Sequence, residues 1–335
     1  MRSKIIRWII WVGILVGFLL IISIFSLFVG STYIPFKKII SLIFTGKGSI
    51  EYSVLFDIRL PRILLGFAIG GALSLAGVIL QGLFRNSLVE PYTLGISGGA
   101  ALGVCLNIIL QLDRNLGILS LPVCGFLGAV LIILILYSLS IKKGILKIQE
   151  LLLMGVMLSF ISSSLIMLIM SISRTEDLHG IVFWIMGSLE EPNWSLIKAI
   201  VSISLLGLVF SYLFCHALNA LSLGEEEALH LGINVEITKR LLFILASLLT
   251  GFSVSIAGII GFVGLAVPHF MRNLVGQDHR ILLISSFLSG AGFLILCDTL
   301  ARTIISPLEL PVGVITGILG GSIFIYIISK KQIRV

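Results

Sequence analysis

The side chains best placed to do chemistry are charged residues at the edges of apolar runs. Arg59 and Arg62 precede a run that extends to Phe84, and Asp298 and Arg302 stand four residues apart near the end of another. Charges beside such runs mark where a membrane ends and water begins. Residues four apart share one helix face, so Asp298 and Arg302 can form an ion pair. The pattern predicts electrostatic recognition of an acidic partner by the arginines.

Motifs for catalysis or metal binding are missing. Gly46-Lys47 is followed by Gly48 and lacks the upstream glycine of a phosphate-binding loop. The five histidines are dispersed without ligand spacing, and the four cysteines stand singly in apolar stretches. The sequence therefore predicts a non-catalytic chain with no metal site and no cofactor of its own, and an ATP-driven process would need a separate ATPase.

The composition predicts the fold class. The chain is 58% hydrophobic and 12% charged over 335 residues, against roughly 25% charged residues in a soluble domain. Ten spanning helices of ~20 residues need ~200 apolar residues, close to what the chain supplies. We therefore expect an all-α polytopic membrane protein. A β-barrel would instead show alternating segments of ~10 residues. The net charge of +7 then concerns membrane orientation and lipid contact, not nucleic acid.

Ten apolar runs predict ten spanning helices in one domain, 1–335. They lie near 8–30, 62–84, 92–110, 118–140, 150–172, 194–216, 239–258, 260–276, 281–301 and 311–329. The first run exceeds the 7–15 residues of a signal-peptide core, so we expect a retained helix. The seventh and eighth runs are divided only at glycines, and nine spans is the alternative count.

Ten spans put both termini on one side, and the basic residues select that side. With cytoplasmic termini, 14 of the 23 Lys and Arg residues lie in the cytoplasm, as the positive-inside rule requires. The other nine are then extracytoplasmic: Lys37, Lys38, Lys47, Arg59, Arg62, Arg114, Arg174, Lys198 and Arg302. The Arg59 and Arg62 pair is therefore expected outside.

Glycines four residues apart form three sets: Gly66 and Gly70; Gly95, Gly99 and Gly103; Gly313, Gly317 and Gly321. Such faces let helix backbones approach closely. They either serve packing alone or slide past one another during transport. In addition, 70–79 resembles 251–260 with five identities, five spans apart. This spacing predicts an inverted repeat, typical of transporters, with chance recurrence of small residues as the alternative.

The most polar segment lies in the long cytoplasmic connection 217–236. Gly224 and Gly232 bracket a stretch long enough for two helical turns, and Glu225 begins it, where the helix dipole favours negative charge. Ala228 and Leu231 are three apart and are expected to share a face. A short surface helix of this kind could dock into a cytoplasmic partner, and an ordinary solvated loop is the alternative.

Together these motifs resemble the iron-chelate and cobalamin permease family of ABC importers, from about residue 55 to the C-terminus. The matching segments are Arg59-Leu-Pro-Arg62, Gly71 to Gly77 with Gln81, Arg85-Asn86, Leu94 to Ala100, Leu223-Gly224 with Ala228 and Leu231-Gly232, Gly261 to His269 with Arg272, Asp278-His-Arg280, Asp298 with Arg302, and Glu309-Leu-Pro-Val-Gly313.

The resemblance implies a type II ABC importer permease fold in the cytoplasmic membrane. It implies a second permease subunit, in a homo- or heterodimer, and two cytoplasmic ATP-binding subunits that carry ATP and magnesium. It further implies an extracytoplasmic substrate-binding lipoprotein or periplasmic protein.

In this family, positions matching Arg59, Arg62 and Arg302 meet acidic residues of the binding protein. The segment from Gly224 to Gly232, with Glu225, Ala228 and Leu231, resembles the coupling helix that the ATPase grips. Asn86 and Leu88 match part of the cytoplasmic gate. This chain departs from the family there, since Ser87 replaces the usual proline and restores a backbone N–H.

The expected cargo is an iron(III)–siderophore chelate, moved by alternating access, with haem or cobalamin as alternatives of the same family. Two other classes stay open: a secondary transporter acting alone, and a permease for free metal ions. The second would be expected to show acidic or histidine ligands along its path.

Overall fold

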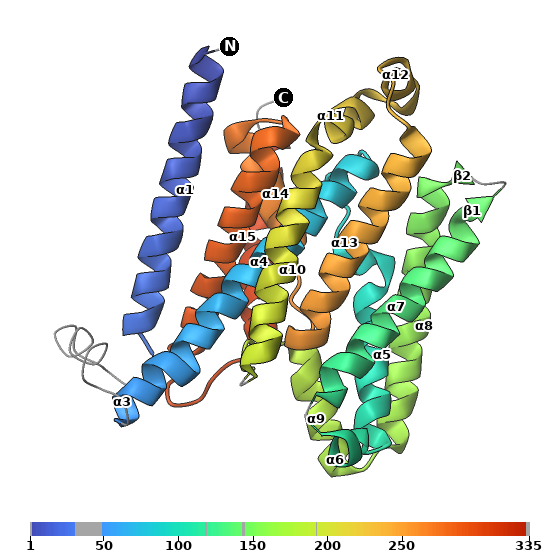
Figure 1. Ribbon diagram of the computed structural model, residues 1–335. Helices are drawn as coiled ribbons and strands as arrows, with labels where there is room; N and C mark the ends of the chain where they lie inside the picture. Colours follow the sequence, from blue (N-terminus) through green and yellow to red (C-terminus); the bar gives the residue numbers. More distant parts are fainter. Residues whose placement is uncertain (1, 31–48, 118, 143–144, 192, 333–335) are drawn as a thin grey trace.

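The computed structural model describes residues 2–30, 49–117, 119–142, 145–191 and 193–332. Lys37, Lys38, Lys47, Lys143 and Arg334, which entered the charge count above, lie outside these ranges. The described residues form a helical bundle with both chain ends on the same side (Figure 1). Seven helices are long and apolar enough to cross a bilayer. The chain is a multi-pass, all-α membrane protein, as its composition predicts.

Each of the ten predicted spans corresponds to a helix. These are α1 (Arg2–Phe28), α4 (Leu60–Leu83), α5 (Ile96–Ile109), α7 (Ser120–Ser140), α8 (Ile148–Ile172), α10 (Trp194–Leu213), α13 (Val235–Ala257), α14 (Val263–Val275), α15 (His279–Ala301) and α16 (Val312–Gln332). At 1.5 Å per residue, the 13 residues of α14 reach only ~20 Å. This helix therefore traverses only part of a ~30 Å hydrocarbon core.

Shorter elements join the spans. They are α3 (Ile50–Ser53), η1 (Val54–Arg59), η2 (Pro91–Leu94), α6 (Leu112–Leu116), α9 (Thr175–Met186), α11 (Cys215–Leu223), α12 (Glu225–His230), and strands β1 (Ile141–Lys142) and β2 (Ile145–Leu146). The strands pair antiparallel, with Ile141 opposite Leu146. The hairpin and α12 lie at the end that holds the termini, whereas α3, α6 and α9 lie at the opposite end (Figure 1).

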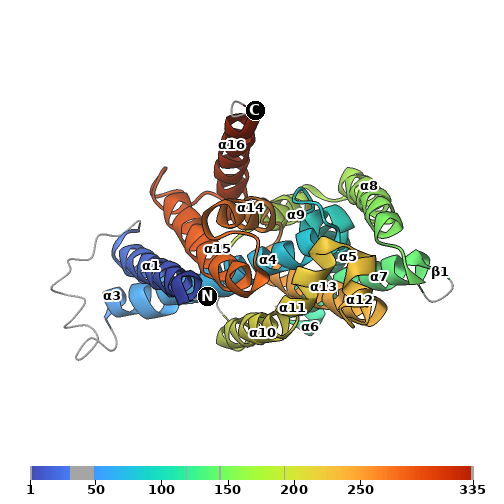
Figure 2. The same cartoon turned by 90° about the horizontal axis from the view of Figure 1, so that it is seen from above.

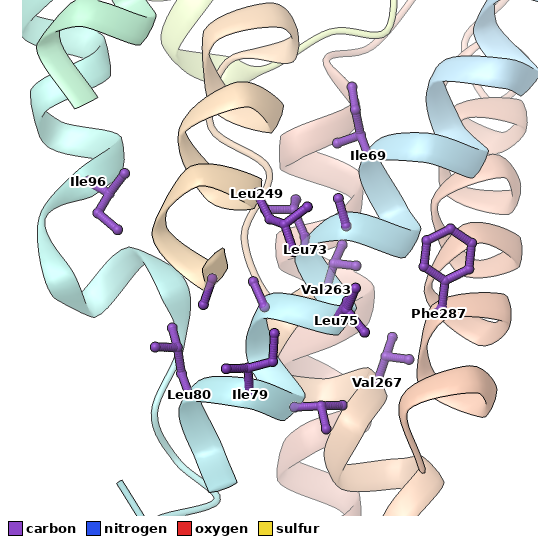
Figure 3. Close-up of a cluster of buried hydrophobic side chains, with 14 of the residues drawn as sticks. Ile69, Leu73, Leu75, Ile79, Leu80, Ile96, Leu249, Val263, Val267 and Phe287 are labelled. Carbon is purple, nitrogen blue, oxygen red and sulfur yellow. The ribbon is translucent and has the colours of Figure 1, made fainter. Parts of the chain in front are cut away.

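Helix α4 is the centre of the bundle. In its most apolar window 89% of residues are buried, against 17% in α8. A helix that is apolar all round belongs inside a protein, and one with an exposed apolar face suits lipid or another subunit. Ile69, Leu73 and Leu75 of α4 lie among side chains of α13, α14 and α15 (Figure 3). Seen from above, α16 projects from the edge of the bundle (Figure 2).

Small residues bring these helices close together. A Cβ built on Gly70 of α4 would overlap the carbonyl of Gly290 in α15, and the reverse also holds. Gly99 of α5 meets Gly128 of α7 in the same way. These contacts support the packing interpretation of the glycine faces. Gly317 of α16 has no atom within 4 Å of a built Cβ, so it packs on no other described helix of this chain.

The division between the seventh and eighth spans is confirmed at the glycines. Helix α13 ends at Ala257, Gly258 adopts φ +71°, and α14 begins at Val263. Helices α4 and α13 run in opposite directions through the bundle, as an inverted repeat requires (Figure 1). The two matching segments differ at their ends, because Gly77 lies inside α4 whereas Gly258 terminates α13.

Candidate functional site

Three arginines meet at the end of the bundle opposite the termini. Arg59 is the last residue of η1, and Arg62 lies in the first turn of α4, next to Pro61. Arg302 follows the last turn of α15. Their exposed fractions are only 2, 5 and 3%, respectively. Sequence reasoning placed them together on the outer side, but it did not predict that all three would be buried.

Arg59 is engaged by the end of α1. Its Nη1 donates to the carbonyl oxygens of Leu27 at 2.6 Å and Phe28 at 3.1 Å. The last carbonyls of a helix have no partner within that helix and carry the negative end of its dipole. Arg59 therefore caps α1 and holds it against α4.

Arg302 forms the ion pair that its spacing from Asp298 predicts. Its Nε lies 2.9 Å from Asp298 Oδ2, and its Nη2 donates to Ser26 Oγ of α1 at 2.9 Å. Both charged side chains are almost fully buried. A buried charge is tolerated when it is paired and hydrogen-bonded, so this pair joins α15 to α1 as a structural unit.

Arg62 has three acidic neighbours. Its Nη2 lies 2.6 Å from Glu309 Oε2 and 3.6 Å from Glu190 Oε2, and its Nη1 lies 3.9 Å from Asp298 Oδ1. The side chains of Glu190 and Glu309 are 75 and 37% exposed. Together these residues line a pocket of about 130 Å³. The charged groups that face water here are therefore the carboxylates.

Sequence reasoning missed Glu190 and Glu309 as members of this cluster. The signal that could have found them is topological, because ten spans place both acids in loops on the same side as Arg62. We call the set Arg59, Arg62, Arg302, Asp298, Glu190 and Glu309 the outer ion cluster.

At the other end of the bundle, the predicted short helix is present as α12. Gly224 precedes it with φ +143° and Gly232 follows it with φ +81°, values that favour glycine. Ala228 is fully buried whereas Leu231 is 64% exposed. Leu231 follows the last residue of this helix, and its backbone N–H donates to the Glu227 carbonyl at 3.0 Å.

A buried lysine ties α12 to its surroundings. Lys239 Nζ lies 2.7 Å from Glu236 Oε1 and 3.0 Å from Glu225 Oε2, and it donates to the Leu146 carbonyl at 3.2 Å. The Leu146 N–H donates to Glu236 Oε2 at 2.9 Å. Lys239 thus joins α12, α13 and the β-hairpin. In the sequence it counted only as one more cytoplasmic charge.

The predicted gate residues lie on a turn that follows α4. Asn86 Oδ1 accepts a hydrogen bond from the Leu88 N–H at 2.9 Å, and both residues are exposed. Asn86 lines a polar pocket of about 330 Å³, in which Arg272 Nη1 donates to Gln81 Oε1 at 3.0 Å. The neighbouring Arg85 approaches Gly224, so this turn and α12 share one end of the bundle.

Asp278 anchors the first helix at the same end. The Arg280 guanidinium, 2.7 Å away, holds the pKa of this carboxyl well below its ordinary range. Asn219 of α11 donates to it at 3.1 Å, and Lys4 of α1 lies 3.3 Å away. One carboxylate therefore joins α1, α11 and α15.

The break between α13 and α14 is held by groups from three other segments. Phe262 N donates to Glu90 Oε1 at 2.6 Å, and Ile260 N donates to Tyr92 Oη at 3.1 Å. From the end of α9, Ser188 N donates to the Ala257 carbonyl at 2.8 Å. A Cβ on Gly313 of α16 would overlap the Ile259 carbonyl. The loops that carry Glu190 and Glu309 therefore adjoin this interior break.

Sequence comparison places the chain among transport proteins. Residues 18–330 match the family described as the FecCD transport family. The chain is 38% identical over 322 residues to the hemin transport system permease protein HmuU of Yersinia pestis, covering 96% of this chain and 95% of that protein. It is 37% identical over 310 residues to the Fe(3+) dicitrate permease FecD of Escherichia coli K12, covering 92 and 95%. It is 36% identical over 336 residues to the vitamin B12 permease BtuC of Klebsiella pneumoniae, covering 99 and 96%.

Two solved structures are similar in fold. One is described as an inward-facing conformation of a metal-chelate type ABC transporter. It is 32% identical with a TM-score of 0.84, covering 96% of this chain and 99% of that one. The other is PsaBC from Streptococcus pneumoniae in complex with Fab, at 18% identity and a TM-score of 0.58, covering 82 and 92%. This second likeness concerns the fold alone.

Proposed function

The chain belongs to the FecCD transport family, and we propose that it is the permease subunit of a binding-protein-dependent ABC importer for iron(III)–siderophore chelates. The observation that carries this proposal is the family match along nearly the whole chain, on a ten-helix bundle similar to a metal-chelate type transporter. Relatives named for hemin and vitamin B12 make haem and cobalamin the alternative cargoes.

In this proposal the chain is one half of a permease pair in the cytoplasmic membrane. Both termini and α12 face the cytoplasm, and two ATPase subunits grip α12. Binding of ATP on those subunits moves α12, and the Lys239 contacts transmit that motion to α13 and the β-hairpin. Asn86 and Leu88 form part of the cytoplasmic gate. The cargo crosses by alternating access and is chemically unchanged.

A groove on the flank of the bundle suits the cargo pathway. It encloses about 410 Å³ between η2, α5, α8 and α9, and its polar and sulfur-bearing lining residues include Ser97, Ser159, Ser163, Met167 and Met170. Hydroxyls and flexible thioethers offer weak, adaptable contacts, which favours passage over tight binding. We infer that the second subunit closes this groove, because only 17% of the residues in the most apolar window of α8 are buried.

The test is reconstitution of the permease in vesicles with its partner ATPase and binding protein. A radiolabelled ferric hydroxamate, haemin and cyanocobalamin are offered separately. We expect uptake of the ferric hydroxamate that requires ATP, the ATPase and the binding protein, and that stops with a hydrolysis-deficient ATPase. Uptake of haemin or cobalamin instead would reassign the cargo.

The same vesicles test the competing class. Uptake driven by a proton or sodium gradient without the ATPase would overturn the importer proposal in favour of a secondary transporter.

A further inference from the structure

We propose that Glu190 and Glu309 occupy the positions that carboxylates of the binding protein take when it docks. Docking then exchanges the internal ion pairs of Arg62 for intermolecular ones. This inference rests on the proposed function, because it assumes that an acidic partner meets the outer ion cluster.

The first argument is access to Arg62. Its side chain is 6% exposed, and Glu309 lies 2.6 Å from its Nη2. Glu190 and Glu309 are the exposed partners of Arg62, whereas Asp298 is buried and bound to Arg302. An incoming carboxylate can therefore reach Arg62 only where Glu309 and Glu190 now lie.

The second argument is mobility without unfolding. Glu190 lies in the irregular chain between α9 and α10, and Glu309 lies in the one between α15 and α16. Either side chain can turn away without breaking a helical hydrogen bond. Asp298 lies within α15, one turn before Arg302, and cannot leave in this way. Asp298 is thus a fixed counterion of Arg62, whereas Glu190 and Glu309 are replaceable ones.

The third argument is charge. The outer ion cluster contains three arginines and three carboxylates, so its formal charge is zero while Glu190 and Glu309 stay in place. A neutral site attracts an acidic partner only weakly at long range. Without the charges of Glu190 and Glu309, the other four residues of the cluster carry two positive charges. The internal acids therefore select partners whose carboxylates are placed well enough to displace them.

The loops that carry Glu190 and Glu309 are also hydrogen-bonded to the interior of the bundle. The chain next to Glu190 is bonded to the end of α13 through Ser188, and Val312, close to Glu309, donates to the Gly187 carbonyl at 3.1 Å. Both acid-bearing loops are therefore hydrogen-bonded to one backbone junction beside the break between α13 and α14.

The experiment measures docking of the partner binding protein on the full permease–ATPase complex in nanodiscs. In the variant Glu190→Gln/Glu309→Gln we expect roughly 2- to 30-fold tighter binding, the range for loss of two competing exposed ion pairs. We also expect a faster association rate that depends more steeply on salt. The matched control is Asp57→Asn/Asp113→Asn, which removes two carboxylates from the same end of the bundle without touching Arg62, and should change binding less than twofold.

The outcomes are distinguishable. Unchanged or weaker docking of the Gln variant, or an equal gain in the control, would overturn the exchange. The variant Arg62→Gln tests the docking role that the proposed function assigns to Arg62. Its chromatographic profile and melting temperature verify that it folds. If Arg62→Gln weakens docking while the Glu variants do not strengthen it, only the exchange fails. If no variant changes docking, the docking role itself fails.

Discussion

The buried ion pair between Asp298 and Arg302 allows a quantitative prediction. The variant Asp298→Asn keeps the shape of the side chain and removes its charge. At 2.9 Å and an effective dielectric constant of about 20, the lost attraction is about 6 kcal/mol. Removing one partner of a buried pair costs ~3–5 kcal/mol in measured cases. Because the amide oxygen can still accept from Arg302, we expect a loss of about 3 kcal/mol in the free energy of unfolding.

The assay is reversible unfolding of the purified permease in mixed micelles with increasing sodium dodecyl sulfate. Asp57→Asn is the control, because Asp57 is an exposed carboxylate at the same end of the bundle, and its loss should cost less than about 0.5 kcal/mol. A second variant adds Arg302→Met to Asp298→Asn. It removes the uncompensated cation, so the double variant should be more stable than the sum of the single effects by about 1–3 kcal/mol.

Two results would refute this reasoning. The first is a loss below about 1 kcal/mol for Asp298→Asn, which would mean that water or another group compensates Arg302. The second is simple additivity in the double variant. Either result would show that the pair is not the structural unit that its burial and its contact with Ser26 indicate.

Two further variants test the contacts of α12 and the helix packing. Lys239→Met should leave ATPase assembly intact but lower the amount of cargo moved per ATP hydrolysed, because α12 loses its ion pair with α13. The control is Lys147→Met, at a lysine that is 51% exposed. An unchanged amount of cargo per ATP in Lys239→Met would contradict the role of this ion pair. Gly70→Ala should lower the melting temperature in detergent, since its methyl overlaps the Gly290 carbonyl and overpacking costs ~1–3 kcal/mol. The added methyl in Gly317→Ala meets open space, so this variant should not lower the melting temperature. Equal shifts in melting temperature for the two variants would disprove the packing argument.

The ten helices could be found in the sequence because a bilayer imposes a local requirement. Each span needs a continuous apolar run, and each run ends where charge or glycine begins. The short length of α14 could not be found in this way. Val263, Leu265 and Val267 are buried among neighbouring helices, so protein rather than lipid surrounds the first half of that helix and full bilayer thickness is not required.

The short elements could likewise be predicted only in part. Gly224 and Gly232 marked α12 because glycine is favoured where φ is positive. The burial of Ala228 and the exposure of Leu231 depended on contacts that spacing does not encode. Helix α9 and the β-hairpin were not predicted, because each is a short element in a connection that sequence reasoning left unassigned.

The outer ion cluster shows both what the sequence predicts and what only the tertiary structure decides. Span counting placed Arg59, Arg62 and Arg302 at one end of the molecule, since sidedness follows from the number of apolar runs and the distribution of charge. Whether each arginine is free or paired depends on loops and helix ends that are distant in sequence. Only folding brings Glu190 and Glu309 to Arg62, because side-chain contacts form in space and leave no periodicity along the chain.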